Sequence, residues 1–291
     1  MATLSAAQLA PILNGYTLAK GPPKTIRVPK ASQLASLQEI SVAGTLLKKQ
    51  TIAIDPATGV RKVSLGANGG AYGIEADGDL HFCLGGKPLT PHITCEVQHA
   101  TPWLGTFKAS VGQPVTATGF FRCLFEHPGF HSNDDAHIFE IHPVRAVDLP
   151  GATHSFDIGL PDPQSIHTWL SPHPLNDQDS KIRVAYDATT DTLTFTNMDG
   201  QDENYVRVSG AASQVHRSPG GSSLSSFTLT SSDIGHPIDV LTLPGTRAAG
   251  ELAKLTAANV TLVALRNIDF TRALAGSYVI NLLAIDLQPG P

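Results

Sequence analysis

The sequence is poor in cysteine: Cys83, Cys95 and Cys123 are the only three among 291 residues, and no two of them form a Cys-x-x-Cys pair. A disulfide framework is therefore not expected, and a reducing compartment fits this cysteine usage. All three cysteines lie within runs of strand-forming residues, which predicts buried free thiols. A thiolate metal site would need further soft ligands that the spacing does not supply.

Long apolar stretches are missing as well. No run of about 18 apolar residues occurs, so we expect no membrane-spanning helix. Residues 1–20 contain no basic segment followed by an apolar one, and Pro11 and Asn14 interrupt their apolar residues. We therefore expect a soluble cytoplasmic protein without a secretory signal.

The chain has no stripe of basic residues in either half. Residues 1–148 carry twelve Lys and Arg against eleven Asp and Glu, and residues 149–291 carry eight against fourteen, which makes the second half acidic. A protein that binds nucleic acid through many phosphates needs several basic side chains on one surface. Nucleic acid is therefore an unlikely partner. The sequence leaves open whether the chain forms an oligomer.

The common catalytic signatures are also absent. The sequence contains no Gly-x-Ser-x-Gly, no Gly-x-x-x-x-Gly-Lys-Ser/Thr, no Gly-x-Gly-x-x-Gly after a strand and no His-Glu-x-x-His. These absences disfavour serine hydrolases, P-loop nucleotide enzymes, dinucleotide-binding enzymes and the commonest zinc proteases. Any catalytic or binding site must therefore be sought in residue clusters.

Short strand-like runs separated by turns dominate the rest of the chain, which predicts an all-β protein with little helix. We divide it into an N-terminal lead-in at 1–38, a first unit at 39–150 and an acidic second unit at 151–291. Each unit is predicted to hold five strand regions with a connector after the third. The best helix in the chain is predicted at 246–257, where Leu252 and Leu255 share one face.

The two units show a weak internal repeat. Residues 227–229, 237–240 and 259–261 resemble 82–84, 92–95 and 114–116 at a common offset of 145, and 284–287 follow 146–149 by 138. One offset shared by three strands indicates a tandem duplication. Five strands with a helix after the third is the order of the OB-fold, a small barrel, so we predict two tandem OB-like barrels. A single β-sandwich remains the alternative.

The first unit resembles bacterial OB-fold-like domains of no settled function. The resemblance lies in Gly78-Asp79-Leu80-His81, in Thr118-Gly119-Phe120 and in Glu140-Ile141-His142-Pro143-Val144. It covers about a quarter of the chain. It implies a fold and brings no catalytic residues with it.

The stretch 120–148 is the first candidate for a functional site, because it concentrates histidines and carboxylates between two strands. We predict a transition-metal site for zinc, copper or iron held by His127, His131 and His137. In a regular strand His137 and His142 point to opposite faces, so these two are not expected to bind the same ion. A polar loop closed by turns, with no ion, is the alternative interpretation.

Further candidate site residues lie within this stretch and before it in the chain. Candidate general bases are Asp134, Asp135 and Glu140, and candidate ligand-binding residues are His81, Trp103, Phe130 and His142. His81 ends a row of alternating Glu75, Asp77 and Asp79 that could hold a cation, although Asp77-Gly78 also favours a solvated hairpin turn. The aromatic residues could stack on bases or sugars, or could simply fill the core.

Three functional hypotheses remain open from the sequence. The first is a soluble binding or interaction module whose ligand, a small molecule or a protein, occupies a His/Asp-rich site in the first barrel. The second is a metal-dependent hydrolase that uses the same loop, with an acidic residue as base for a metal-bound water. The third is single-stranded nucleic-acid binding through an OB face.

Overall fold

The computed structural model describes residues 3–19, 21–48, 50–54, 58, 60–65, 79–87, 89–98, 101–129, 136–156, 181–198, 205–218, 224–232, 234–256 and 258–290. The first half holds β1 (Thr3–Ser5), α1 (Ala6–Leu13), β2 (Thr17–Ala19), β3 (Thr25–Pro29), α2 (Ala31–Leu34), β4 (Glu39–Leu47), β5 (Gln50–Ile54), β6 (Arg61–Leu65), β7 (Leu80–Gly85), β8 (Ile93–Val97), a 3-10 turn (Thr101–Trp103), α3 (Leu104–Ala109), β9 (Pro114–His127), β10 (His137–Leu149) and β11 (Ala152–Ser155). The second half holds β12 (Arg183–Asp187), β13 (Thr192–Thr196), β14 (Tyr205–His216), β15 (Ser225–Thr230), β16 (Ile238–Thr242), α4 (Arg247–Lys254), β17 (Asn259–Ile268), α5 (Phe270–Leu274) and β18 (Ile280–Pro289).

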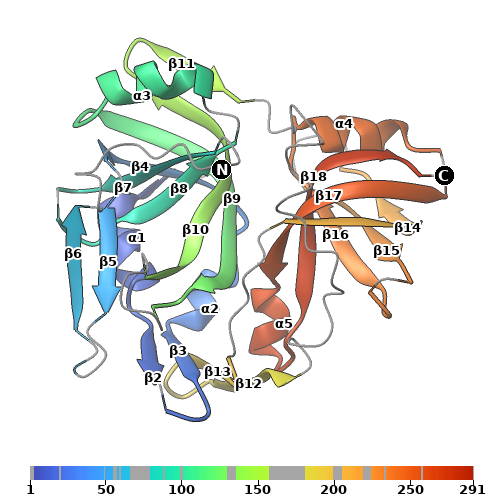
Figure 1. Cartoon of the computed structure of the whole chain (residues 1–291), viewed down its shortest axis with the longest axis horizontal. Coiled ribbons are helices and arrows are strands. Elements are labelled where there is room, and N and C mark those ends of the chain that lie inside the picture. Colours follow the sequence, from blue (N-terminus) through green and yellow to red (C-terminus); the bar gives the residue numbers. More distant parts are fainter. Residues whose placement is uncertain are drawn as a thin grey trace.

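Five strands of the first half form a ring, which we call the first barrel. Antiparallel pairs join β4 to β7, β7 to β8, β10 to β9 and β9 back to β4. A parallel pair of β8 with β10 closes the ring. Helix α3 lies between the third and fourth strands (Figure 1). Phe107 on this helix packs against Phe82, with the ring centroids 5.2 Å apart. This is the strand order of an OB-fold.

The second barrel repeats that order. Strands β14, β15, β16, β18 and β17 form a closed barrel, the third and fifth strands are again parallel, and α4 lies between the third and fourth. Phe82 is opposite Cys95 in the first barrel, and Phe227 is opposite Val240 in the second, each 145 residues later. The prediction of two OB-like barrels is confirmed, and the closed rings exclude a single sandwich of open sheets. A duplication event stays a prediction.

The N-terminal segment is attached to both halves of the chain. Strand β1 lies parallel to β4 of the first barrel. Strand β3 pairs with β13, so that β12, β13, β3 and β2 form a four-stranded sheet. The backbone N–H and the hydroxyl of Ser32 donate to the Asp191 carboxylate at 2.9 and 2.8 Å. Residues 1–38 thus bring together parts of the chain that are more than 150 residues apart.

The strand pattern explains where the core lies. Alternate residues such as Ile40 and Val42 on β4, or Phe82 and Leu84 on β7, point into the first barrel and are buried. Helix α4 begins after Thr246, whose hydroxyl accepts from the Ala249 N–H at 3.2 Å, a good N-cap. Cys83, Cys95 and Cys123 are buried free thiols, as predicted. Within the described part of the chain, no helix is long and apolar enough to cross a membrane.

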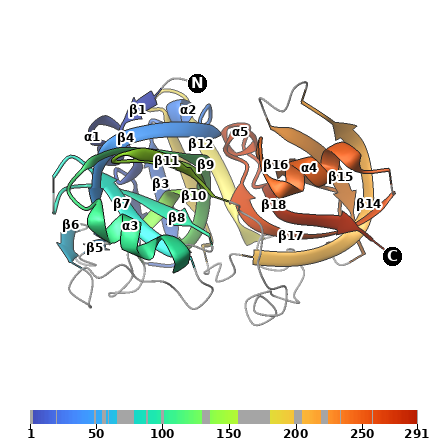
Figure 2. The same ribbon diagram turned by 90° about the horizontal axis from the view of Figure 1, so that it is seen from above.

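The two barrels lie side by side and are in contact (Figure 2). An apolar cluster joins them: Phe120 from β9 packs with Tyr205, Leu243, Val263, Leu265, Leu283 and Ile285 of the second half. Hydrogen bonds also cross the boundary. Arg122 Nε donates to the Arg266 carbonyl at 2.7 Å, and the Cys123 N–H donates to Asn267 Oδ1 at 2.9 Å. The surface of β9 that faces away from the first core is therefore covered by the second barrel.

Candidate metal centre

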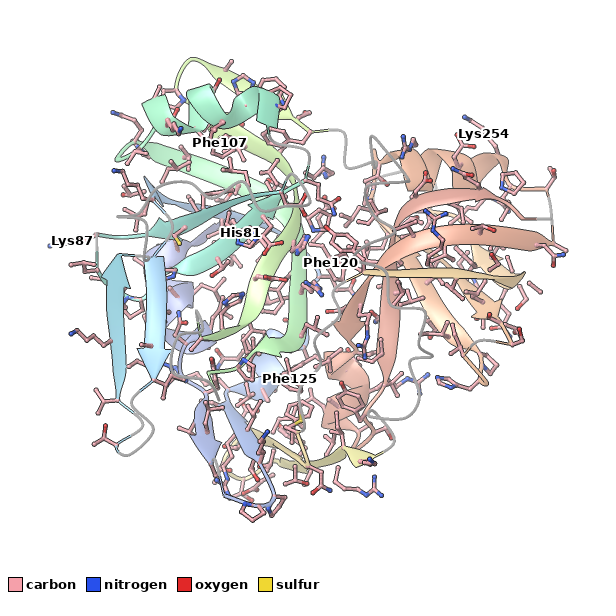
Figure 3. All side chains as sticks on the ribbon, viewed as in Figure 1. His81, Lys87, Phe107, Phe120, Phe125 and Lys254 are labelled. Atoms are coloured by element: carbon pink, nitrogen blue, oxygen red, sulfur yellow. The ribbon has the colours of Figure 1, made fainter. Side chains whose placement is uncertain are left out.

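A row of polar side chains crosses the outer face of the first barrel. On β7 and β8, Phe82 and Cys95 point inward, so their neighbours His81 and Glu96, which are opposite each other, point outward. The parallel pairing of β8 with β10 brings Glu140 and His142 beside Glu96. Figure 3 shows His81 in the first barrel and Phe120 on the side that faces the second. We call this group, with the partners described below, the polar centre.

His142 lies in the middle of the polar centre and is completely buried. Its Nδ1 is 2.7 Å from Glu96 Oε2 and 3.3 Å from Glu140 Oε1, and its Nε2 is 3.9 Å from Asp79 Oδ2. Burial favours the neutral ring, but the Glu96 charge and hydrogen bonds to Glu140 and Glu96 outweigh it and raise the pKa of His142 to about 10. Without a metal, the ring is therefore an imidazolium at neutral pH.

The two glutamates of the centre are ionised despite being buried. Burial on its own would raise the pKa of both carboxyls. The charges of His142 and His81, the latter 2.6 Å from Glu96 Oε1, lower the pKa of Glu96 instead. Arg122, which is fully buried and bonded to Glu140 through Nη1, lowers the pKa of Glu140, and His137 adds a contact of 3.3 Å.

Asp79 connects the centre to the second barrel. The hydroxyl of Tyr205, the first residue of β14, donates to Asp79 Oδ2 at 2.7 Å and accepts from Gln98 Nε2 at 2.6 Å. The same hydroxyl lies 3.4 Å from His142 Nε2. Gln98 is buried, and its Oε1 finds no hydrogen-bond partner among the residues that the structure describes. A buried amide oxygen without a partner in the described part of the chain is therefore carried by a side chain that contacts Tyr205.

The centre contains a group of ligand atoms suited to one cation. Asp79, Glu96 and His142 each offer one such atom, and the three atoms lie within 4.8 Å of one another. A shared ion would take one imidazole nitrogen of His142 and one oxygen from each carboxylate. Arg122 Nη1, which lies 3.2 Å from His142 Nδ1, adds a positive charge at the edge of this group.

Four of the residues predicted as site residues meet in this centre: His81, His137, Glu140 and His142. His137 and His142 both contact the Glu140 carboxylate, at 3.3 Å each, but only His142 belongs to the group of possible metal ligands, so the expectation that the two do not bind the same ion stays a prediction. The β9–β10 register shifts between His137 and Phe139, so strict alternation does not hold there. Asp79, expected at a solvated turn, is buried and part of the centre.

Among the remaining predicted site residues, Trp103 alone is described with its side chain, and it lies outside this centre. Phe130, His131, Asp134 and Asp135 lie outside the described residues, as do Glu75 and Asp77. His127 ends β9 opposite His137, and only its backbone is described. Trp103 packs against the rings of His154 and Phe156 at 4.8 and 5.6 Å, near α3 and β11. The predicted ligand set of His127, His131 and His137 therefore stays a prediction.

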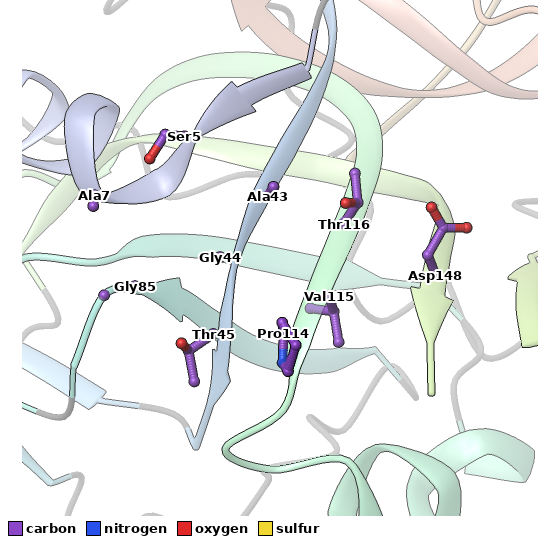
Figure 4. A pocket seen from close by; sticks show the side chains of 11 residues that line it. Ser5, Ala7, Ala43, Gly44, Thr45, Gly85, Pro114, Val115, Thr116 and Asp148 are labelled. Atoms are coloured by element: carbon purple, nitrogen blue, oxygen red, sulfur yellow. The ribbon is translucent and has the colours of Figure 1, made fainter. Parts of the chain in front are cut away.

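A surface groove elsewhere on the first barrel has little chemistry to offer. It measures about 430 Å³ and is lined by Ser5, Ala7, Ala43, Gly44, Thr45, Gly85, Gly86, Pro114, Val115, Thr116 and Asp148 (Figure 4). Its only ionisable side chain, Asp148, accepts a hydrogen bond from the Thr153 hydroxyl. Gly44 is needed for packing, because a Cβ there would lie 2.7 Å from that of Ala6. We therefore look to the polar centre for function.

Comparisons with known proteins assign the chain to no family. No protein-family profile matches the chain, and no curated protein matches it in sequence. Among solved structures, the single-stranded DNA binding protein from Thermus aquaticus aligns over 88% of this chain and 93% of its own, with 11% identity and a TM-score of 0.24. At that TM-score the alignment carries no weight for fold or ligand, so the strand order of the barrels alone supports the OB-like fold.

Proposed function

We propose that this protein binds one divalent metal ion at Asp79, Glu96 and His142, and that it works as a metal-dependent binding module of two OB-like barrels. The observation that carries the proposal is the convergence of three buried ligand atoms within 4.8 Å. Buried ionisable groups of this kind are expected to be paired or to coordinate a metal.

The charge of the polar centre supports a divalent ion. Asp79, Glu96 and Glu140 are three buried carboxylates, and Arg122 contacts Glu140. His142 and His81 contact Glu96, so protons held by these histidines, or a bound cation, can balance its charge. A divalent ion bound by His142 would take over this role and displace the imidazolium proton.

The donor atoms favour zinc, ferrous iron or manganese over a soft ion. Two carboxylates and an imidazole are oxygen and nitrogen donors, which such ions accept. Cys95 contributes no thiolate, because burial and then the charges of nearby acidic groups raise the pKa of its thiol. Cuprous copper, which prefers sulfur, is therefore disfavoured among the metals expected from the sequence.

A binding or structural role fits the burial of the centre better than catalysis. Asp79, Glu96 and His142 are 3, 5 and 0% exposed, whereas a catalytic ion keeps a position open to substrate. In the hydrolase alternative Glu140 would act as the base for a metal-bound water. The ion pair with Arg122 keeps Glu140 ionised. It also engages the carboxylate that would have to accept a proton from the water, which disfavours that role.

Single-strand nucleic-acid binding has less support. On the second barrel the outward positions of β15 and β16 include Thr228 and Asp239, which are bonded to each other at 3.3 Å. The Asp239 carboxylate repels phosphate, and neither side chain of this pair offers a ring on which a base could stack. On the first barrel the outward face of β8 and β10 is occupied by the polar centre.

Metal analysis of protein purified without a histidine tag tests the proposal. We expect about one transition-metal ion per chain, and its loss in Asp79→Asn and in His142→Gln. His154→Gln is the matched control, because His154 packs edge to face against Trp103 outside the centre. Circular dichroism would verify the fold of each variant. Full metal content in folded His142→Gln, or a metal-free wild type that takes up no Zn²⁺ on titration, would refute the proposal.

A further inference from the structure

We infer that Tyr205 of the second barrel is a positioning residue for the metal centre of the first, so that ion binding and docking of the second barrel strengthen each other. This inference rests on the proposed function. It assigns to the second barrel a role at the centre, and it makes the contact between the barrels sensitive to the ion.

The position of Tyr205 supports this role. Its ring is anchored in the second barrel, because Tyr205 is opposite Leu265 in the β14–β17 ladder and belongs to the apolar cluster with Phe120. Its hydroxyl lies in the first barrel's centre, 2.7 Å from Asp79 Oδ2 and 3.4 Å from His142 Nε2. One side chain thus contacts two of the three proposed ligands.

The hydroxyl can fix the orientation of the Asp79 carboxylate. It donates one hydrogen bond to Oδ2 and accepts one from Gln98, so two residues of the first barrel fix the hydroxyl while the ring is packed in the second. Hydrogen bonds of this kind to a metal ligand typically contribute about 10- to 100-fold to metal affinity. Tyr205 is therefore expected to act on affinity through Asp79.

A second connection joins the centre to the second barrel through Arg122. Its Nη1 bonds Glu140 in the centre, and its Nε donates to the Arg266 carbonyl on β17 at 2.7 Å. Next to it, the Cys123 N–H donates to Asn267 Oδ1 across the same boundary at 2.9 Å. Displacement of the second barrel would therefore disturb both Asp79 and Glu140.

Thermodynamic linkage then requires reciprocity. If the docked second barrel raises the affinity for the ion by some factor, the ion favours the docked arrangement by the same factor. Hydrogen exchange of the Cys123 amide measures docking, because its hydrogen-bond acceptor belongs to the second barrel. Titration with Zn²⁺ measures the affinity.

The experiment compares the full-length wild type with Tyr205→Phe, which keeps the packed ring and removes only the hydroxyl. The matched control is Tyr186→Phe, which loses a hydroxyl bond of 2.9 Å to Asp191 at the four-stranded sheet. By calorimetry, Tyr205→Phe should bind Zn²⁺ about 10- to 100-fold more weakly than wild type, and Tyr186→Phe should match wild type. Zn²⁺ should slow exchange at Cys123 in wild type, and less so in Tyr205→Phe.

The outcomes separate this inference from the proposed function. If wild type and Tyr205→Phe bind Zn²⁺ equally well, or if Zn²⁺ slows Cys123 exchange equally in both, the coupling is refuted while the metal site stands. If wild type binds no Zn²⁺, the proposed function fails and the coupling with it. Weaker binding by a folded Tyr205→Phe, with the control unchanged, supports the coupling.

Discussion

Removing Arg122 should destabilise this protein severely, whether or not a metal is bound. Arg122 is fully buried, bonds the Glu140 carboxylate through Nη1, and donates to the Arg266 carbonyl through Nε. In Arg122→Met the stem is replaced by an apolar chain, but Glu140 loses its cation and the carbonyl loses its donor. Breaking a buried ion pair by removing one partner costs about 3–5 kcal/mol.

Two local features modify that estimate. His142 Nδ1 lies 3.2 Å from Arg122 Nη1, so removal of the guanidinium relieves a repulsion with the imidazolium and offsets part of the loss. His137 stays 3.3 Å from Glu140 and keeps part of the compensation. We therefore expect a loss of about 3 kcal/mol in the free energy of unfolding, a large part of the roughly 5–15 kcal/mol that domains possess.

The loss should depend on pH in a defined direction. Arg122 lowers the pKa of Glu140 below its ordinary value, so the carboxylate stabilises wild type above about pH 4.5 and this stability falls as the pH drops through the folded pKa. Without Arg122, burial raises the pKa of Glu140, and acid removes the unpaired charge. The difference between wild type and variant should therefore shrink from pH 8 to pH 5.

Urea unfolding with chelator present measures both quantities, and a double-mutant cycle with Glu140→Gln isolates the pair. We expect Arg122→Met to cost much less in the Glu140→Gln background. A cost under about 1 kcal/mol at pH 8, or a cost that is the same with and without Glu140, would refute the electrostatic account of this pair.

Two further predictions follow from His142 and from helix α4. Because the pKa of His142 is raised from 6.5 to about 10, the stability it contributes to the metal-free protein is complete below pH 6.5 and declines as the pH approaches 10. Wild type should therefore lose more stability than His142→Gln between pH 8 and pH 10, and parallel curves would contradict the raised pKa. Thr246→Ala removes the N-cap of α4 and should lower the free energy of unfolding by about 1 kcal/mol in urea, with Thr230→Ala at the exposed end of β15 as control.

The barrels could be predicted from the sequence because their signals are local. Alternating apolar residues predicted β7, β9 and β10, turn residues predicted the breaks between them, and an offset of 145 related Phe82 to Phe227. Strand order then followed from the position of the helix. The pairing of β3 with β13 could not be predicted, because it joins residues more than 160 apart and leaves no periodic signal.

The polar centre was predicted only in part. His81, His137, Glu140 and His142 were found because histidines and carboxylates cluster in the sequence. Glu96, Arg122 and Tyr205 were missed, because each is a single polar residue in an apolar run and their partners are set by inter-strand and inter-barrel contacts. A usable signal did exist: Glu96, Arg122 and Glu140 are lone charges within apolar strands, and buried charges require partners.

The contact between the barrels contains a buried ion network beside its apolar residues, and this network has a role beyond holding the barrels together. Phe120, Leu265 and Leu283 already form an apolar contact there, and such contacts stabilise docking without desolvating any charge. A buried ion network beside them is not needed for stability, since apolar residues of similar volume often serve as well or better. What the network supplies, and apolar packing cannot, is a set of carboxylates that can respond to a cation. The apolar contact therefore holds the barrels together with or without the ion, and the ion network lets ion binding change how strongly the barrels are docked.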